Sequence, residues 1–142
     1  MIYTDNTKKA LALCFEAHLN QKDDSGLPYV FHPFHLAEQM NDEATTIVAL
    51  LHDVIEDTAV TFEDLIKMGF SDEVIEAIRL LTHDKKAPYL DYVRKIKDNP
   101  VAKAVKLADM LHNSDTTRLN VITEKELKRV EKYAEAIKLL TE

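Results

Sequence analysis

The chain has 142 residues, enough for one domain to bury a substantial core without disulfide bonds, so we expect a single domain over residues 1–142. Hydrophobic residues make up 46% of the chain and charged residues 30%, a composition that excludes an intrinsically disordered protein. The net charge of -7 argues against nucleic-acid binding, because that function requires a basic face.

Apolar residues recur at helical spacing along most of the chain, whereas two-residue alternation is almost absent. The sequence therefore predicts an all-α fold, a bundle-like array of about seven to eight helices. Local signals mark the helix ends: Pro33 suits a first helical position, Gly69 suits a C-terminal end, and residues 61–64 and 123–126 form capping boxes. The expected helices cover approximately residues 5–21, 33–41, 43–56, 61–69, 71–81, 88–99, 100–111 and 123–140.

Several kinds of protein and site are excluded by what the sequence lacks. No apolar run approaches the length of a membrane span and the N-terminus turns polar at Thr4, so we expect a cytoplasmic protein with no signal peptide and no membrane partner. A single cysteine, Cys14, excludes an internal disulfide and a cysteine-rich metal site. With only 2 glycines the chain has no glycine-rich phosphate loop, so any phosphate chemistry must use other groups.

Residues 47–58 concentrate side chains that carry chemistry. An apolar run leads directly into His52 and Asp53, and Glu56 and Asp57 follow shortly after. On one continuous helix these four residues would crowd onto one flank, because residues three or four apart share a face. Carboxylates this close repel one another unless a cation lies among them or water screens them. The alternative, a solvated helix end, is disfavoured because acids in a last turn oppose the helix dipole.

Two further residues are candidates to complete a metal site with this pair. His32 precedes a predicted helix in an apolar setting, where the alternative is a buried core histidine. Asp109 lies on an otherwise apolar helix face, where a lone carboxylate is costly unless it is paired or bound to a metal. Two imidazoles and two carboxylates form a mixed nitrogen and oxygen donor set that suits a divalent Mn, Fe or Zn ion.

The order and surroundings of these residues carry a family resemblance. The ordered set His32, His52-Asp53 and Asp109 resembles the HD-domain metal-dependent phosphohydrolases, which are named for the adjacent His-Asp pair. Three blocks are similar to the hydrolase domain of RelA/SpoT-type enzymes and to the small free-standing alarmone hydrolases. These blocks are Gly26-x-Pro28-Tyr29-x-x-His32-Pro33, Leu50-Leu51-His52-Asp53-x-x-Glu56-Asp57-Thr58 and Lys106-Leu107-Ala108-Asp109-x-x-His112-Asn113.

The resemblance implies an HD-type helical domain that removes the 3′-pyrophosphate of guanosine tetra- or pentaphosphate, usually with Mn²⁺. The metal ligands that it implies are His32, His52, Asp53 and Asp109. Glu56 and Asp57 would be catalytic, positioning and deprotonating a water that the metal activates, and Asn113 would face the phosphates or ribose. The expected partner is a small phosphorylated nucleotide.

The chain departs from the family pattern where the substrate is expected to bind. The family has an arginine in the turn before the Gly-x-Pro-Tyr motif, whereas this chain has Lys22 followed by two aspartates. Lys22 supplies a point charge but not a bidentate guanidinium, and the aspartates repel phosphate. Lys85 and Lys86 are candidate phosphate contacts, with a solvated charge cluster as the alternative. Of the other histidines, we expect His18 to pack near the site entrance and His83 to lie at the surface.

Two alternatives to an alarmone hydrolase stay open at this point. The altered turn over residues 22–25 is compatible with a phosphohydrolase that acts on another nucleotide or phosphoester. A metal-binding regulatory module without turnover is the other alternative, although Glu56 and Asp57 count against it because a structural site needs no proton acceptor. His35 and His112 either support the site or merely pack beside it. The native ion and the number of subunits do not follow from the sequence.

Overall fold

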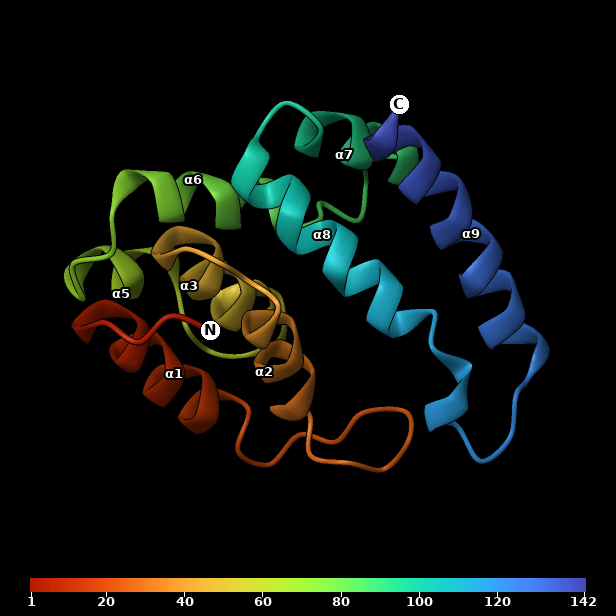
Figure 1. Cartoon of the computed structure of the whole chain (residues 1–142), viewed down its shortest axis with the longest axis horizontal. Coiled ribbons are helices and arrows are strands. Elements are labelled where there is room, and N and C mark those ends of the chain that lie inside the picture. The colour runs from red at the N-terminus through yellow and green to blue at the C-terminus, as the bar shows by residue number, and fades with distance from the viewer.

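The computed structural model describes residues 1–142 as nine α-helices and one short 3₁₀ helix, with no β-strand (Figure 1). The all-helical prediction is therefore confirmed. The helices are α1 (Asp5–Ala17), α2 (Phe31–Glu38), α3 (Glu43–Leu51), α4 (Val54–Asp57), α5 (Phe62–Lys67), α6 (Asp72–Leu81), α7 (Tyr89–Ile96), α8 (Pro100–Asn113), η1 (Thr116–Arg118) and α9 (Glu124–Thr141). None of these helices has the length and apolar character that a membrane crossing requires.

Side-chain caps explain why several helices begin where they do. Thr61 and Asp64 exchange the two hydrogen bonds of a capping box at the start of α5, as the sequence predicts. The predicted box at α9 is also present, with the backbone N–H of Thr123 donating to Glu126. Asn99 caps α8 by accepting a hydrogen bond from a backbone N–H of its first turn. Each cap satisfies donors that lack an intrahelical partner and stabilises the helix by about 1 kcal/mol.

Helix α3 forms the centre of the hydrophobic core. Every residue from Thr45 to Leu51 is buried, and α3 packs against α1, α2, α6 and α8. Figure 1 shows α3 between α1 on one side and α8 on the other, with α9 running along the outer side of α8. Because α2 and α8 both pack on α3 and on each other, side chains from these three helices can meet in one buried place.

The predicted helix over residues 43–56 is interrupted in its last third. Helix α3 ends at Leu51, His52 and Asp53 form a turn, and α4 begins at Val54. The ring Nδ1 of His52 forms a hydrogen bond with the carbonyl oxygen of Ala49 at 2.7 Å. The side chain thus takes the place of a backbone N–H donor to this carbonyl in the last turn of α3. Asp53 is the N-cap residue of α4, with φ −106° and ψ −3°. The interruption turns the eight predicted helices into nine.

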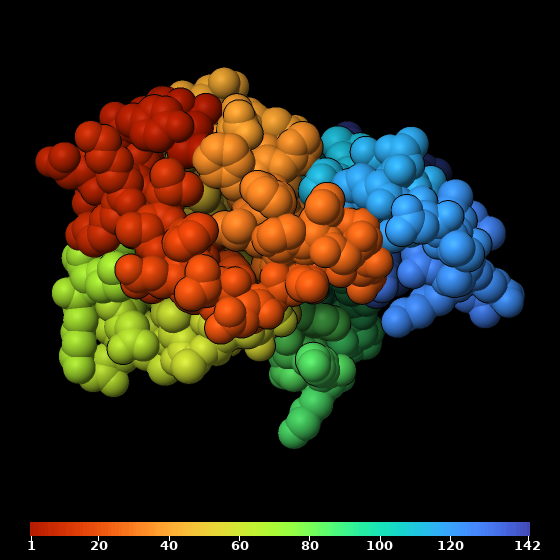
Figure 2. Space-filling view, turned by 90° about the horizontal axis from the view of Figure 1, so that it is seen from below, coloured from red at the N-terminus to blue at the C-terminus, as the bar shows by residue number.

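The first helix is also shorter than predicted, ending at Ala17 rather than near residue 21. The chain beyond it forms a narrow turn, in which the N–H of Asp23 donates to the carbonyl of Leu27 and the N–H of Tyr29 donates to the carbonyl of Gln21, both at 2.8 Å. In Figure 2 this turn, in orange, lies across the middle of one face, and the green segment between α6 and α7 projects below it. The backbone of residues 21–23 therefore forms hydrogen bonds with residues 27–29 instead of continuing the helix.

Candidate metal centre

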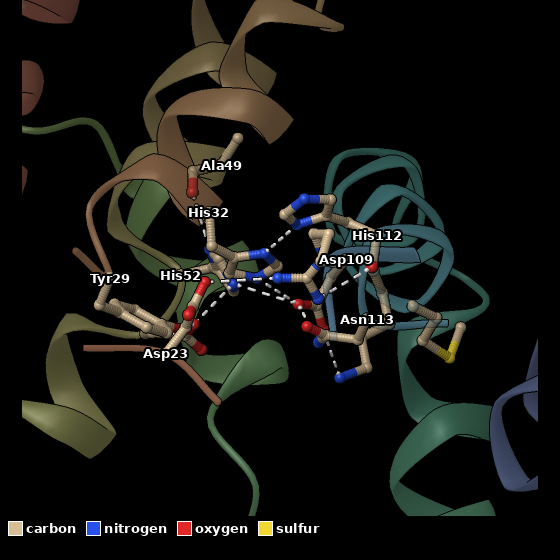
Figure 3. Close-up of polar contacts among 12 residues, drawn as sticks. Asp23, Tyr29, His32, Ala49, His52, Asp109, His112 and Asn113 are labelled. Atoms are coloured by element: carbon tan, nitrogen blue, oxygen red, sulfur yellow. Dashed lines mark hydrogen bonds and ion pairs between the residues drawn. The ribbon is translucent and has the colours of Figure 1, made fainter. Parts of the chain in front are cut away.

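Three of the four predicted metal ligands converge inside the fold. His32 of α2, His52 at the end of α3 and Asp109 of α8 each offer one ligand atom, and these atoms all lie within 4.8 Å of one another. The three residues are buried, with exposed fractions of 3%, 4% and 6%. Figure 3 shows the two imidazole rings and the carboxylate turned toward one place between α2, α3 and α8. We call these three residues the His–His–Asp cluster.

The geometry of His52 leaves one ring nitrogen directed at the cluster. Its Nδ1 is bonded to the carbonyl of Ala49, so Nδ1 carries the hydrogen and Nε2 of the neutral ring presents a lone pair. Nε2 is buried without a well-formed hydrogen bond and lies 2.9 Å from Oδ2 of Asp53 and 3.5 Å from Oδ1 of Asp109. Burial alone would lower the pKa of His52, but the two carboxylates raise it well above its ordinary value. A cation on this nitrogen, either a proton or a metal ion, would therefore be stabilised by the two carboxylates.

Asp109 is held as a buried anion by neighbours from its own helix and from α2. Its Oδ2 accepts from Nζ of Lys106 at 3.1 Å, and its Oδ1 accepts from the side-chain amide of Asn113 at 3.1 Å and lies 2.8 Å from Nε2 of His32. Burial alone would raise the pKa of Asp109, but Lys106 and His32 hold it well below its ordinary value. The ion pair and the hydrogen bonds thus offset the free-energy cost of removing this carboxylate from water.

Asp53 lies beside His52 rather than inside the compact His–His–Asp cluster. Its Oδ2 accepts a hydrogen bond from the hydroxyl of Tyr29, which comes from the turn between α1 and α2. Burial alone would raise the pKa of Asp53, but the neighbouring His52 lowers it below its ordinary value. Asp53 is therefore an oriented carboxylate at the edge of the cluster, next to the free nitrogen of His52.

This donor set fits a divalent metal ion. Two imidazole nitrogens and two carboxylates are available, and a buried nitrogen that faces two carboxylates has no protein donor to satisfy it. Mixed nitrogen and oxygen ligands suit ions such as Mn²⁺, Fe²⁺ and Zn²⁺. The fourth predicted ligand, Asp53, is close enough to His52 to join the set.

A family model described as "HD domain" matches residues 10–137 of the chain. The chain belongs to the HD-domain family. The adjacent His52 and Asp53 are the kind of pair for which the family is named; His52 belongs to the His–His–Asp cluster and Asp53 lies beside it. The predicted resemblance to HD-domain proteins is confirmed.

Several named proteins are similar to this HD-domain chain. Mouse guanosine-3′,5′-bis(diphosphate) 3′-pyrophosphohydrolase MESH1 is 38% identical over 114 residues, which are 70% of this chain and 63% of that protein. The guanosine-3′,5′-bis(diphosphate) 3′-pyrophosphohydrolase of Aquifex aeolicus is 33% identical, covering 92% of this chain and 20% of that protein. GTP pyrophosphokinase rsh of Brucella melitensis is 37% identical, covering 76% of this chain and 16% of that protein. The chain thus spans less than two thirds of each of these relatives.

The fold is shared with a solved structure described as a metazoan ortholog of SpoT that hydrolyses ppGpp. The two structures have a TM-score of 0.77, and the match covers 99% of this chain and 88% of the other at 26% sequence identity. The predicted HD-type helical array is therefore confirmed.

The two predicted catalytic acids of the HD domain lie on α4, next to the cluster. Glu56 lines a cavity of about 120 Å³ together with cluster residues, and its carboxylate accepts a hydrogen bond from the backbone N–H of His83. The carbonyl of Asp57 accepts a hydrogen bond from the side chain of Gln21 at 2.7 Å, which ties α4 to the turn after α1. Burial and the nearby Asp53 raise the pKa of the Asp57 carboxyl. The sequence predicts one straight helix over residues 43–56. The structure instead has a break after α3, and the two acids lie on the separate short helix α4.

A second hollow, of about 230 Å³, contains the predicted substrate residues Asn113 and Lys22. His32 lies in its wall, so this hollow also reaches the metal centre. The wall carries Arg118 and Arg129, two guanidinium groups to which the sequence analysis assigns no role. The three cationic side chains are suited to a phosphorylated ligand, but three carboxylates, Asp23, Asp24 and Glu126, line the same hollow.

The two aspartates that follow Lys22 are paired with these arginines. Oδ2 of Asp23 lies 3.4 Å from Nη1 of Arg118, and Oδ2 of Asp24 lies 2.9 Å from Nη1 of Arg129. The repulsion of phosphate that the sequence predicts for these aspartates is therefore balanced by two cations. The arginines lie 95 and 105 residues further along the chain, so no local pattern links them to the turn.

The lysines of the segment between α6 and α7 lie outside both hollows. Lys85 and Lys86 are exposed, although Lys85 is near enough to Asp57 to lower the pKa that burial raises. The prediction for His83 is wrong, because this residue is half-buried and lines the cavity beside Glu56. Its backbone N–H donates a hydrogen bond to the carboxylate of Glu56.

Three other residues shape the site in ways that sequence reasoning missed or left open. Tyr29 and Lys106 lie inside the motif blocks, but only the fold shows that they bond Asp53 and Asp109. His18 is buried with its ring 4.9 Å from that of Tyr29, in agreement with the expected packing near the site.

Proposed function

We propose that the chain removes the 3′-pyrophosphate from guanosine 3′,5′-bis(diphosphate), with a divalent metal as its cofactor. The observation that carries this proposal is the buried His–His–Asp cluster, which opens into a cavity lined by the carboxylate of Glu56. Two of the relatives that share this HD domain are named for that activity.

Four side chains would hold the ion in this reaction: His32, His52, Asp53 and Asp109. We propose Mn²⁺ as the native ion, because the donor set combines imidazoles with carboxylates and includes no thiolate. When bound, such an ion supplies positive charge to a phosphoryl group and lowers the pKa of water. Lys106 and Tyr29 keep the two carboxylate ligands ionised and oriented.

Glu56 and Asp57 would position the attacking water and take its proton. The N–H of His83 holds one carboxylate oxygen of Glu56 and leaves the other free to accept a proton from water. Burial and Asp53 raise the pKa of Asp57, which makes this carboxylate a stronger proton acceptor than an ordinary aspartate. Both acids act without any glycine-rich phosphate loop.

The hollow that contains Asn113 would take the nucleotide. Lys22, Arg118 and Arg129 would face its phosphates, with Asn113 donating to a phosphate or ribose oxygen. Lys85 and Lys86 would add positive charge at the entrance near Asp57. Because His32 lies in the same wall, a phosphate bound here would be next to the metal centre.

One observation favours a second candidate, a phosphohydrolase of the same kind that acts on a less highly charged nucleotide or phosphoester. The ion pairs with Asp23 and Asp24 occupy part of the hydrogen-bonding capacity of Arg118 and Arg129. This leaves fewer free guanidinium donors for a doubly pyrophosphorylated substrate.

Hydrolysis assays with Mn²⁺ on guanosine 3′,5′-bis(diphosphate), a panel of other nucleotides and an aryl phosphate ester test both candidates. We expect release of pyrophosphate from the first substrate, and its loss in Glu56→Gln while Mn²⁺ binding persists. Turnover of only another nucleotide or ester would favour the second candidate. Metal binding without turnover of any substrate would identify a regulatory module instead.

A further inference from the structure

His112 contacts a proposed metal ligand on the side opposite the metal centre. Its Nδ1 lies 2.6 Å from Nδ1 of His32, while Nε2 of His32 faces Asp109 at 2.8 Å (Figure 3). The two imidazole planes differ by 11°, with ring centroids 4.9 Å apart. Because the lone pair of a ring nitrogen lies in the ring plane, nearly parallel rings with nitrogens this close form a direct N–H···N hydrogen bond.

Only one proton assignment of this pair is compatible with metal binding. The ring nitrogen that binds a metal must present a lone pair, so Nε2 of His32 carries no hydrogen and Nδ1 carries it. The facing Nδ1 of His112 must then accept, so the hydrogen of His112 is on its own Nε2. With the opposite assignment, Nε2 of His32 would donate to Asp109 and would be unable to bind a metal.

We infer that His112 is a positioning residue that fixes the tautomer and ring orientation of His32 for metal binding. This inference rests on the metal site of the proposed function. It gives α8 two tasks, because the helix supplies the ligand Asp109 and, one turn later, the acceptor for the ligand His32. The end of α8 is itself fixed, since the carbonyl of His112 accepts from Arg118 at 3.2 Å.

The exposed neighbour His35 provides a matched control. Its ring centroid lies 4.3 Å from that of His112, and no hydrogen bond joins its ring to a proposed metal ligand. A histidine-to-phenylalanine substitution at His35 therefore alters the same ring contact without removing a hydrogen bond to a proposed ligand.

Metal affinity of the metal-free protein, measured by titration with Mn²⁺ against a competing chelator, tests the role of His112. In His112→Phe the ring remains but the acceptor is lost, and we expect Mn²⁺ to bind about 10- to 100-fold more weakly. His112→Asn places an amide oxygen where Nδ1 lies, so we expect it to keep most of the affinity. His112→Gln, which places its amide nearer the position of Nε2, should resemble the phenylalanine variant. His35→Phe should bind Mn²⁺ as the unmodified protein does.

Nitrogen-15 spectra of the histidine rings in the unmodified protein give a second readout that does not depend on how the variants fold. With diamagnetic Zn²⁺ bound, we expect His32 protonated at Nδ1 and His112 at Nε2. A proton on Nδ1 of His112 would overturn the inference, as would unchanged affinity in His112→Phe or equal losses in the asparagine and phenylalanine variants. If the unmodified protein binds no metal, the proposed function fails as well; if it binds metal but these patterns are absent, only the role of His112 is refuted.

Discussion

Replacing Lys106 by methionine removes the cation that accompanies Asp109 in the interior. Nζ of Lys106 lies 3.1 Å from Oδ2 of Asp109, and the two side chains are only 13% and 9% exposed. Removing one partner of a buried ion pair costs about 3 to 5 kcal/mol, because the other charge is left uncompensated. At about 3 °C per kcal/mol for a domain of this size, we expect the Tm of the metal-free variant to fall by about 9 to 15 °C.

The matched control for this variant is Lys67→Met. Lys67 forms an ion pair with Glu63 at a similar distance, 3.1 Å, but both side chains are more than two thirds exposed, at 72% and 75%. An exposed pair of this kind contributes at most about 0.5 kcal/mol, so its loss should shift the Tm by less than about 2 °C. Thermal melts followed by circular dichroism, with metal removed by a chelator, measure both variants. If the two substitutions shift the Tm equally, the reasoning about the buried pair is refuted.

Two further substitutions test the metal ligands. In Asp109→Ala we expect loss of bound Mn²⁺ by metal analysis and a lower Tm, because a ligand is lost and Lys106 is left buried without its partner; unchanged metal content would refute the assignment. In Tyr29→Phe the hydrogen bond to Asp53 is lost, and we expect about tenfold weaker Mn²⁺ binding in a chelator titration. Tyr3→Phe, at an exposed position, is its control, and equal affinities of the two variants would exclude a role for the hydroxyl.

The features that the sequence predicts correctly depend on residues close together in the chain. The capping boxes at Thr61 and Thr123 need only four consecutive residues, so they are visible without a structure. Burial of Asp109 follows from its place on an apolar helix face, and its partner Lys106 lies three residues earlier on the same face. Helical spacing places the two residues on one face, but the ion pair itself is seen only in the structure.

The features that the sequence does not predict depend on contacts that form only when the chain folds back on itself or when separate helices pack together. Helix α1 ends early because the chain beyond it pairs with residues 27–29 and because the side chain of Gln21 bonds α4. His32 and His112 are 80 residues apart, so their hydrogen bond exists only once α2 and α8 are packed together. The break at His52 arises from a local bond to Ala49, but the carboxylates that its free nitrogen faces come partly from α8.

The stability of the metal-free protein and the added stability that a metal ion provides should respond to pH in opposite directions. Nε2 of His52 faces Asp53 and Asp109, which raise its pKa well above 6.5, so in the metal-free protein a proton on this nitrogen supplies the missing cation. Because the folded-state pKa is raised, this stabilisation is fully present below the ordinary value and is lost as pH rises through the raised value. Lys106, the other cation beside Asp109, keeps its charge throughout, since its pKa is raised well above its ordinary value.

A metal ion must displace that proton, so Mn²⁺ affinity should increase over the same pH range. We therefore expect the Tm of the metal-free protein to fall as the pH rises from 6.5 through the raised pKa of His52, while the increase in Tm produced by a fixed Mn²⁺ concentration becomes larger. The two carboxylates do not titrate in this range, because the pKa values of both Asp53 and Asp109 are lowered. Thermal melts with and without Mn²⁺ across this range measure both trends. An increase in Tm on adding Mn²⁺ that does not depend on pH would mean that no proton leaves the site, and that His52 is not one of the ligands.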